Sequence, residues 1–215
     1  MVFKSDTVPQ AALSAKDAPQ PELLWEWLRR TCIDGSPACD ALAIPHNSNW
    51  SSGRMFHPYS NLDLPVNEQR KRAALRAAVE PLAELMQVKG DSECRNGIAS
   101  VYGAPDEFCD FEKLRPPAEA IADCGETEGS GGMSLTGCVS RYSYLRYSLA
   151  AGLSEREKLG VNPFGFGIVA ATDTHTGLAA AGLEDNHPGS HGNDRDPLRR
   201  LLAKVKVPGD IATGS

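Results

Sequence analysis

The chain has 215 residues, of which 41% are hydrophobic and 23% charged, so it is large enough to form the core of one globular domain, or of a large piece of one. Its formal net charge of −6 argues against a general nucleic-acid-binding or anionic-membrane surface. No run approaches the ~18 apolar residues of a membrane span, and the N-terminus lacks the basic start and apolar core of a signal peptide.

Residues 1–20 mix Ala, Pro, Ser and charged residues without periodicity, which predicts a loose N-terminal arm. We expect the folded domain over residues 21–207 and a truncated tail over 208–215. The first helix is predicted to begin at Pro21 and to end near Cys32.

A short apolar strand is expected over Ala41–Pro45, running directly into the polar segment His46–Asn49. His46 shares a strand face with Leu42 and Ile44, so its side chain should emerge where the strand ends. A polar loop follows, and Pro65 then opens the strongest predicted helix, from Val66 to about Glu80.

Another strand is predicted over Leu82–Val88, leading into the polar segment Lys89–Glu93. Cys94–Gly137 has little periodicity and reads as a long irregular insertion. A helix over Ser140–Leu159 follows. Its buried stripe is predicted to consist of Tyr142, Leu145, Leu149 and Leu153.

The apolar run Phe164–Ala171 has the character of a parallel strand buried on both faces. Asp173 and His175 come after it, two residues apart and on the same side if the backbone stays extended. Such an Asp-x-His pair can place one oxygen and one nitrogen on the same metal ion, and a turn with a capping Asp173 and a solvated His175 is the alternative.

The order helix, strand, helix, strand, helix, strand predicts an α/β fold with a parallel sheet, in which functional residues gather at the carboxyl ends of the strands. All three polar clusters fall there. We therefore expect a metal site that binds a divalent ion (Zn, Mn or Fe), lowers the pKa of bound water and polarises a substrate oxygen. Its candidate ligands are His46, Glu93, Asp173 and His175, of which Asp173 and His175 are also the candidate catalytic residues.

Four further residues are candidates for binding a small anionic substrate. Asn47 and Asn49 can orient metal ligands or donate to the substrate. Arg54 and Lys89 can meet an anionic group such as a phosphate. The alternative for both cations is an ordinary solvated charge.

Several motifs in order resemble the bacterial family DUF3604, which looks like a branch of the PHP (polymerase and histidinol phosphatase) metallohydrolases. They are Ile44–Asn49, Gly53–Phe56, Lys89–Glu93, Cys109–Glu112 and Asn162–Gly177. The resemblance implies a distorted (β/α) barrel of the TIM-barrel-like type, a centre of two or three metals, and hydrolysis of a phosphoester. It carries His46, Asp173 and His175 over as metal ligands, and Glu93 with them.

PHP-type sites also take an His-x-His pair from the first strand, and no such pair occurs in these 215 residues. We therefore expect an incomplete barrel with an incomplete metal site, and little or no activity from the isolated chain.

Six cysteines are many for a cytosolic chain of this length, and none forms a C-x-x-C pair. Cys32 and Cys39 bracket a tight turn and can close a small disulfide loop, with six buried free thiols as the alternative. A different hypothesis is thus a non-catalytic exported module, held by disulfides, that binds a small ligand or partner through Cys94–Gly137. Cytoplasmic and exported locations, and the oligomeric state, stay open.

Overall fold

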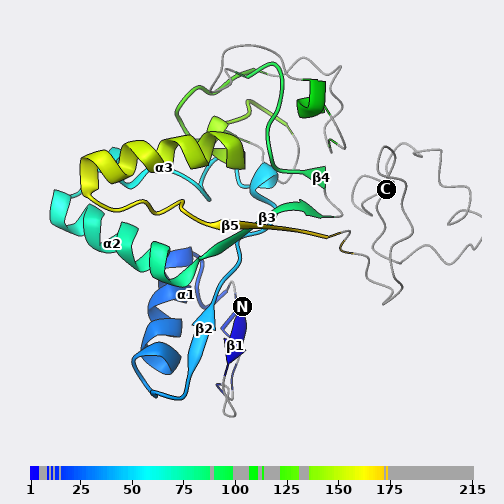
Figure 1. The fold of residues 1–215 in the computed structure, drawn as a ribbon. Helices are drawn as coiled ribbons and strands as arrows, with labels where there is room; N and C mark the ends of the chain where they lie inside the picture. The colour runs from blue at the N-terminus through cyan, green and yellow to red at the C-terminus, as the bar shows by residue number, and fades with distance from the viewer. Residues whose placement is uncertain are drawn as a thin grey trace, which may run out of the picture. The chain divides into compact units, whose positions relative to one another are not determined.

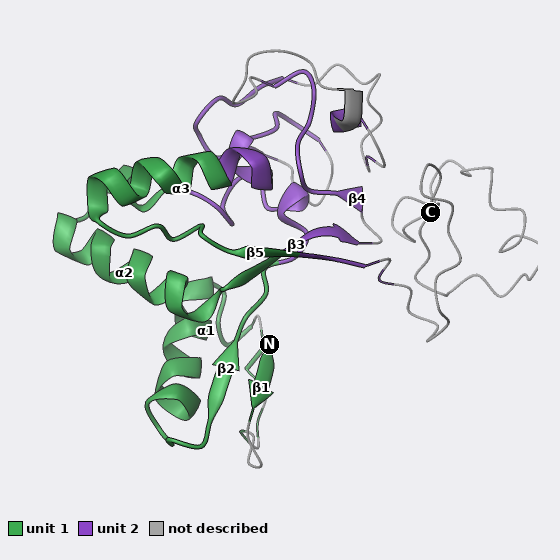
Figure 2. Cartoon of the chain, in the orientation of Figure 1, with its two compact units in different colours: residues 1–45, 58–83, 149–168 green, residues 46–57, 84–148, 169–215 purple. Residues whose placement is uncertain are grey.

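The structure is a computed structural model, and it places helices and strands of mixed α/β character in two compact units. The residues that it describes are 1–4, 9, 11, 13–14, 16–87, 90–98, 107–110, 113, 122–130, 136–171 and 173. Unit 1 comprises residues 1–45, 58–83 and 149–168, and unit 2 comprises 46–57, 84–148 and 169–215 (Figure 2).

Three α-helices and five short strands are present in the described part of the chain (Figure 1). The helices are α1 (Pro21–Leu28), α2 (Val66–Val79) and α3 (Leu145–Leu159). The strands are β1 (Val2–Lys4), β2 (Asp40–Leu42), β3 (Leu82–Gln87), β4 (Gly90–Asp91) and β5 (Gly167–Ala170). None of the helices among these residues has the length and apolar character needed to cross a membrane.

The first sheet corrects two expectations about the N-terminal region. β1 pairs antiparallel with β2, with Phe3 opposite Ala41, so Val2–Lys4 is not part of a loose arm. β2 also ends earlier than predicted, because Ala43 N–H leaves the ladder and donates to the carbonyl of Val79 at 2.8 Å.

The second sheet has the strand order β4-β3-β5. β3 and β4 form an antiparallel pair with Met86 opposite Asp91. β3 and β5 are parallel, because their hydrogen bonds from Gly167 N to Pro81 O and from Ala171 N to Met86 O advance in the same direction. The predicted parallel pairing thus holds for β3 and β5 but not for β2. The described strands form two small sheets and no closed barrel, so the TIM-barrel-like architecture is not confirmed.

The predicted strand Phe164–Ala171 is shorter than expected and is not buried on both faces. Phe164 and Phe166 are buried, but they precede the strand, and within β5 the side chain of Ile168 is 45% exposed. The apolar run therefore contributes its aromatic rings to packing from a loop, while the strand itself lies near the surface.

Helix α2 matches its prediction closely, whereas the predicted stripe of α3 is wrong in its second half. Leu145 is buried, but Leu149 and Leu153 are 38% and 66% exposed. The residues that follow Leu145 on the buried side of the helix are small or polar, apart from the last: Ser148, Gly152, Glu155 and Leu159. Hydrophobic periodicity alone therefore selects the wrong face.

Glu155 is buried because three donors of unit 1 converge on its carboxylate. The Tyr59 and Ser60 amides donate to Oε2 at 2.9 and 3.1 Å, and Ser60 Oγ donates to Oε1 at 2.5 Å. A carboxylate at the start of the 3-10 turn Tyr59–Asn61 satisfies backbone N–H groups that have no partner within the turn. Glu155 therefore attaches α3 to this turn.

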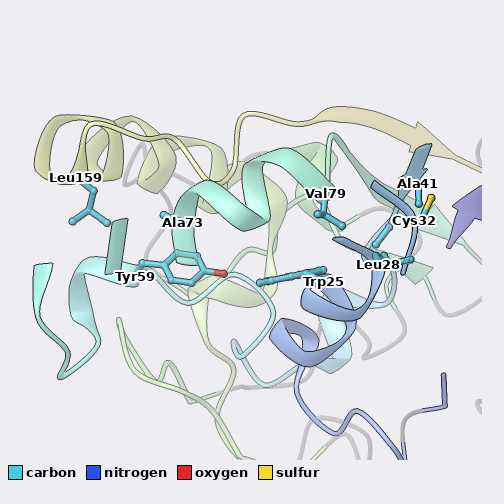
Figure 3. Close-up of a cluster of buried hydrophobic side chains, with 9 residues drawn as sticks. Trp25, Leu28, Cys32, Ala41, Tyr59, Ala73, Val79 and Leu159 are labelled. Carbon is cyan, nitrogen blue, oxygen red and sulfur yellow. The ribbon is translucent and has the colours of Figure 1, made fainter. Parts of the chain in front are cut away.

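The core of unit 1 is an apolar cluster contributed by α1, α2, the end of α3 and β2 (Figure 3). Its buried members are Trp25, Leu28, Cys32, Ala41, Ala43, Tyr59, Ala73, Val79 and Leu159.

Beside Trp25 lies a buried ion pair, in which Arg76 Nη2 is 2.9 Å from Glu80 Oε2. Trp25 Nε1 donates to Glu80 Oε1 at 2.8 Å, and the Arg76 guanidinium lies 5.0 Å from the Phe164 ring centroid. The pair is thus desolvated but hydrogen-bonded and stacked, as buried charges must be.

All six cysteines are paired, so the alternative of six free thiols is wrong. Cys32–Cys39 closes the small loop that the sequence suggested. Cys94–Cys109 and Cys124–Cys138 lie in unit 2, whose described residues have little regular structure between β4 and α3. Disulfides support folds whose apolar core is small.

Candidate functional site

The predicted site residues that the structure describes all belong to unit 2. They are His46, Asn47, Asn49, Arg54, Glu93 and Asp173. Lys89 and His175 lie outside the described residues.

The first polar cluster forms a tight turn after β2. His46 is exposed, Asn47 adopts the left-handed conformation with φ 58°, and the 3-10 turn Ser48–Trp50 follows. Asn is one of the few non-glycine residues that tolerate this conformation, because its short polar side chain bonds locally at little steric cost. The Asn49 amide donates to Ser92 Oγ at 3.3 Å, which joins this turn to the second polar cluster.

The second cluster includes β4, and its last residues, Ser92 and Glu93, are held against the start of α3. Ser92 is buried, and its own amide donates to Leu85 O at 2.8 Å. The Leu145 and Arg146 amides donate at 2.9 Å to the carbonyls of Ser92 and Glu93, respectively. The first N–H groups of a helix need such external acceptors, so the position of residues 92–93 is fixed by α3.

The side chain of Glu93 extends from this buried backbone and pairs with a helix residue. Arg146 Nη2 lies 2.5 Å from Glu93 Oε1, and the two side chains are 28% and 37% exposed. The carboxylate is thus accessible to solvent while a guanidinium compensates its charge.

The third cluster is placed by the pairing of β5 with β3. Because these strands are parallel and Ala171 N bonds to Met86 O at 3.1 Å, their carboxyl ends lie at the same edge of the sheet. Asp173, which follows β5, is half-buried and has a φ of 50°. A left-handed residue ends the extended conformation, so the predicted extended path through Asp173 to His175 is interrupted at its first member.

Arg54 forms a salt bridge with Glu128. Its Nε lies 3.2 Å from Glu128 Oε2, and the Arg54 side chain is largely exposed. An exposed pair of this kind contributes little stability and exchanges readily with solvent or with another anion. The anion-binding role of Arg54 stays a prediction.

A model of the family described as "Protein of unknown function (DUF3604)" matches residues 1–210. The chain belongs to the DUF3604 family. The match confirms the resemblance to DUF3604 and covers the N-terminal region that contains β1, whereas the relationship to the PHP metallohydrolases stays a prediction. No curated protein and no solved structure matches the chain.

The candidate metal ligands of this DUF3604 chain show only some of the features of a metal site. In the described ranges, no three His, Cys, Asp or Glu side chains come together as a metal-binding group. Asn47 Oδ1, by contrast, is buried in the site turn and accepts no hydrogen bond from the described residues, as expected of an oxygen that orients a ligand. The metal-ligand assignments stay predictions, with His175 outside the described part.

Sequence reasoning missed a buried ion pair next to Glu93 in the DUF3604 chain. Lys113 Nζ contacts Asp91 Oδ2, and both side chains are buried. Burial raises the pKa of Asp91 and lowers that of Lys113, and each partner opposes the shift of the other. Asp91 was visible in the Lys89–Glu93 motif, but no pattern in the irregular insertion distinguishes Lys113.

Proposed function

We propose that the chain is a metal-dependent hydrolase-type domain of the PHP kind that acts on a phosphoester. The observation that carries the proposal is the linkage of three polar clusters within unit 2. The Asn49–Ser92 hydrogen bond joins the first cluster to the second, and β3 joins the second to the third, because β4 pairs with one side of β3 and β5 with the other. Three segments distant in sequence thus meet around one small sheet, which supports a site shared by their imidazole and carboxylate groups.

The ligands in this proposal are His46, Glu93, Asp173 and His175. A divalent metal bound by them would lower the pKa of a water and polarise a phosphoryl oxygen. Glu93, which is paired with Arg146, would hold the metal through its partly exposed carboxylate. Asn47 orients a ligand through its buried oxygen, and Arg54 and Lys89 bind the anionic part of the substrate.

Metal content tests this function directly. The purified full chain, loaded with Zn or Mn and dialysed, is expected to retain metal in stoichiometric amount, and Asp173→Ala is expected to lose it. Asp110→Ala, at an exposed carboxylate of the same unit, is the matched control and should keep the metal. Hydrolysis of a generic aryl phosphate is expected to be slow, since no His-x-His pair is present. A wild-type chain that retains no metal contradicts the proposal.

A second candidate is the exported, non-catalytic binding module, in which the three disulfides would hold the irregular part of the domain together. Disulfides persist in oxidising compartments, where small irregular domains often depend on them. The two candidates differ in metal: bound metal supports the hydrolase, whereas paired cysteines in a chain that retains no metal support the module.

A further inference from the structure

Lys113 is a buried cation whose contacts lie on both sides of Glu93. Its side chain is 2% exposed, and its Nζ donates to Asp91 Oδ2 and to the carbonyl of Cys94. The Tyr144 ring centroid lies 5.8 Å from the same nitrogen. Two of the three donors of this ammonium group are thus used by the immediate surroundings of Glu93, and an aromatic ring lies close to its charge.

Asp91 links the Lys113 ammonium group to the backbone of Glu93. While Asp91 Oδ2 accepts from Lys113, Asp91 Oδ1 accepts from the backbone amide of Glu93. On the other side, Cys94 is held through its carbonyl by Lys113 and through its sulfur by the disulfide to Cys109. The backbone of Glu93 is therefore held on both sides, and its side chain is the partly exposed member of a buried segment.

A purely stabilising role does not account for this arrangement. Burying two opposite charges costs several kcal/mol of desolvation per ion, in round terms, and apolar residues of similar volume often serve stability equally well. What apolar residues lack is a hydrogen bond to the Glu93 amide and to the Cys94 carbonyl. The specific contribution of Lys113 and Asp91 is thus the orientation of the segment between them.

We propose that Lys113 is a positioning residue for Glu93, acting through Asp91 and the Cys94 carbonyl to present the Glu93 carboxylate in one orientation. The consequence for metal binding rests on the proposed hydrolase function, whereas the conformational consequence does not. Substituting a residue that holds a metal ligand in place, without contacting the metal itself, typically lowers metal affinity about 10–100-fold.

Two double variants avoid an unpaired buried charge. Lys113→Met with Asp91→Asn keeps an oxygen for the Glu93 amide, and Lys113→Met with Asp91→Leu removes it. We expect amide hydrogen exchange at Glu93 to be about tenfold faster in the Leu variant than in the Asn variant, and faster in both than in the wild type. The control is Arg141→Met with Asp123→Asn, which removes another ion pair of unit 2 and should leave Glu93 exchange unchanged.

Zinc affinity provides the second readout, measured by competition with a chelating dye. Both Lys113 variants should bind zinc at least about tenfold more weakly than the wild type and the control. Lys113→Arg, which keeps the charge and the donors, should recover most of the affinity. Unchanged Glu93 exchange in both double variants overturns the positioning role. If Glu93 exchange responds but the wild type binds no zinc, the positioning role stands and the hydrolase function fails.

Discussion

The backbone amide of Asn49 lies 3.3 Å from the hydroxyl oxygen of Ser92, and this contact joins two motifs separated by 43 positions in the sequence. Ser92 is buried, and its backbone also bonds to β3 through Leu85 and to α3 through Leu145. A single serine therefore connects three segments, which makes its hydroxyl a sensitive point of the candidate site.

Ser92→Ala should destabilise the chain by roughly 1–3 kcal/mol, because the half-buried Asn49 amide loses the Ser92 acceptor. Ser148→Ala is the matched control: Ser148 is equally buried, but its hydroxyl donates to the Tyr144 carbonyl within the same helical stretch, so its removal leaves no donor without a partner. Urea unfolding measures both. An equal, small loss for the two variants would contradict the role given to Ser92.

Gly53→Ala should be among the more damaging glycine substitutions in unit 2. Gly53 has a φ of +79°, and a Cβ there would lie 2.3 Å from Ser140 Oγ and 2.6 Å from Ser140 Cβ. Left-handed backbone costs a residue with a side chain about 1–2 kcal/mol, and overpacking adds about 1–3 kcal/mol.

Gly97→Ala separates these two terms. Gly97 has a similar φ of +85°, but no atom of the described residues outside its chain neighbours lies within 4 Å of its Cβ position. Only the backbone cost of about 1–2 kcal/mol should remain. Thermal and urea unfolding of the two variants should differ by the overpacking term, and identical stabilities would show that Ser140 moves away without cost.

Glu155→Gln should destabilise the chain by roughly 1.5–3 kcal/mol, because hydrogen bonds to a charged acceptor are worth about that much and the amide group offers one oxygen instead of two. The Tyr59 amide and both Ser60 donors compete for that oxygen. Glu157→Gln, at an exposed position of the same helix, should stay within about 0.5 kcal/mol of the wild type. Parallel urea titrations at constant pH compare the two.

The failure to predict Glu155 shows where sequence patterns stop being informative for this fold. Pro65 precedes α2 and Pro81 follows it, and because proline starts helices and interrupts them, these two residues predicted the bounds of α2. The buried face of α3 depends instead on partners 95 and 96 positions away, at Ser60 and Tyr59. A buried glutamate with distant donors is indistinguishable in sequence from a solvated one, so the leucines were assigned to the core in its place.

The candidate site divides in the same way. Asn49 and Glu93 were recognisable because polar residues follow apolar runs in the sequence. Parallel strands do not bring them together, because β2 lies in another sheet and β4 runs antiparallel to β3; the Asn49–Ser92 hydrogen bond does. Arg146 and Lys113 gave no comparable signal, since one lies in a helix with ordinary charge content and the other in a segment without periodicity. Ion pairs between elements far apart in sequence follow from tertiary packing, which composition does not encode.

The disulfides predict a definite thiol count. The denatured, unreduced chain should show no reactive thiol, and the reduced chain six. Closing loops of separation 15 and 7 corresponds to about 3 and about 2.4 kcal/mol of chain entropy, so Cys94→Ser/Cys109→Ser should cost more stability than Cys32→Ser/Cys39→Ser. Alkylation with mass spectrometry and urea unfolding are the measurements. Six thiols in the unreduced chain would remove the support for an oxidising compartment.

The Arg76–Glu80 pair predicts a pH dependence of stability with a definite sign. Burial raises the pKa of Glu80 above its ordinary value of 4.5, and the Arg76 guanidinium offsets this only in part. A raised folded-state pKa means that the contribution of Glu80 is fully present below pH 4.5 and is lost as the pH rises through the folded-state value. The unfolding free energy of the wild type minus that of Glu80→Gln should therefore fall between pH 4 and pH 8.

Asp17→Asn is a control of opposite sign, because hydrogen bonds from Ser14 lower the pKa of Asp17 below 3.8 and its contribution to stability is lost as the pH falls. A Glu80 difference that rises with pH would show that Arg76 outweighs burial.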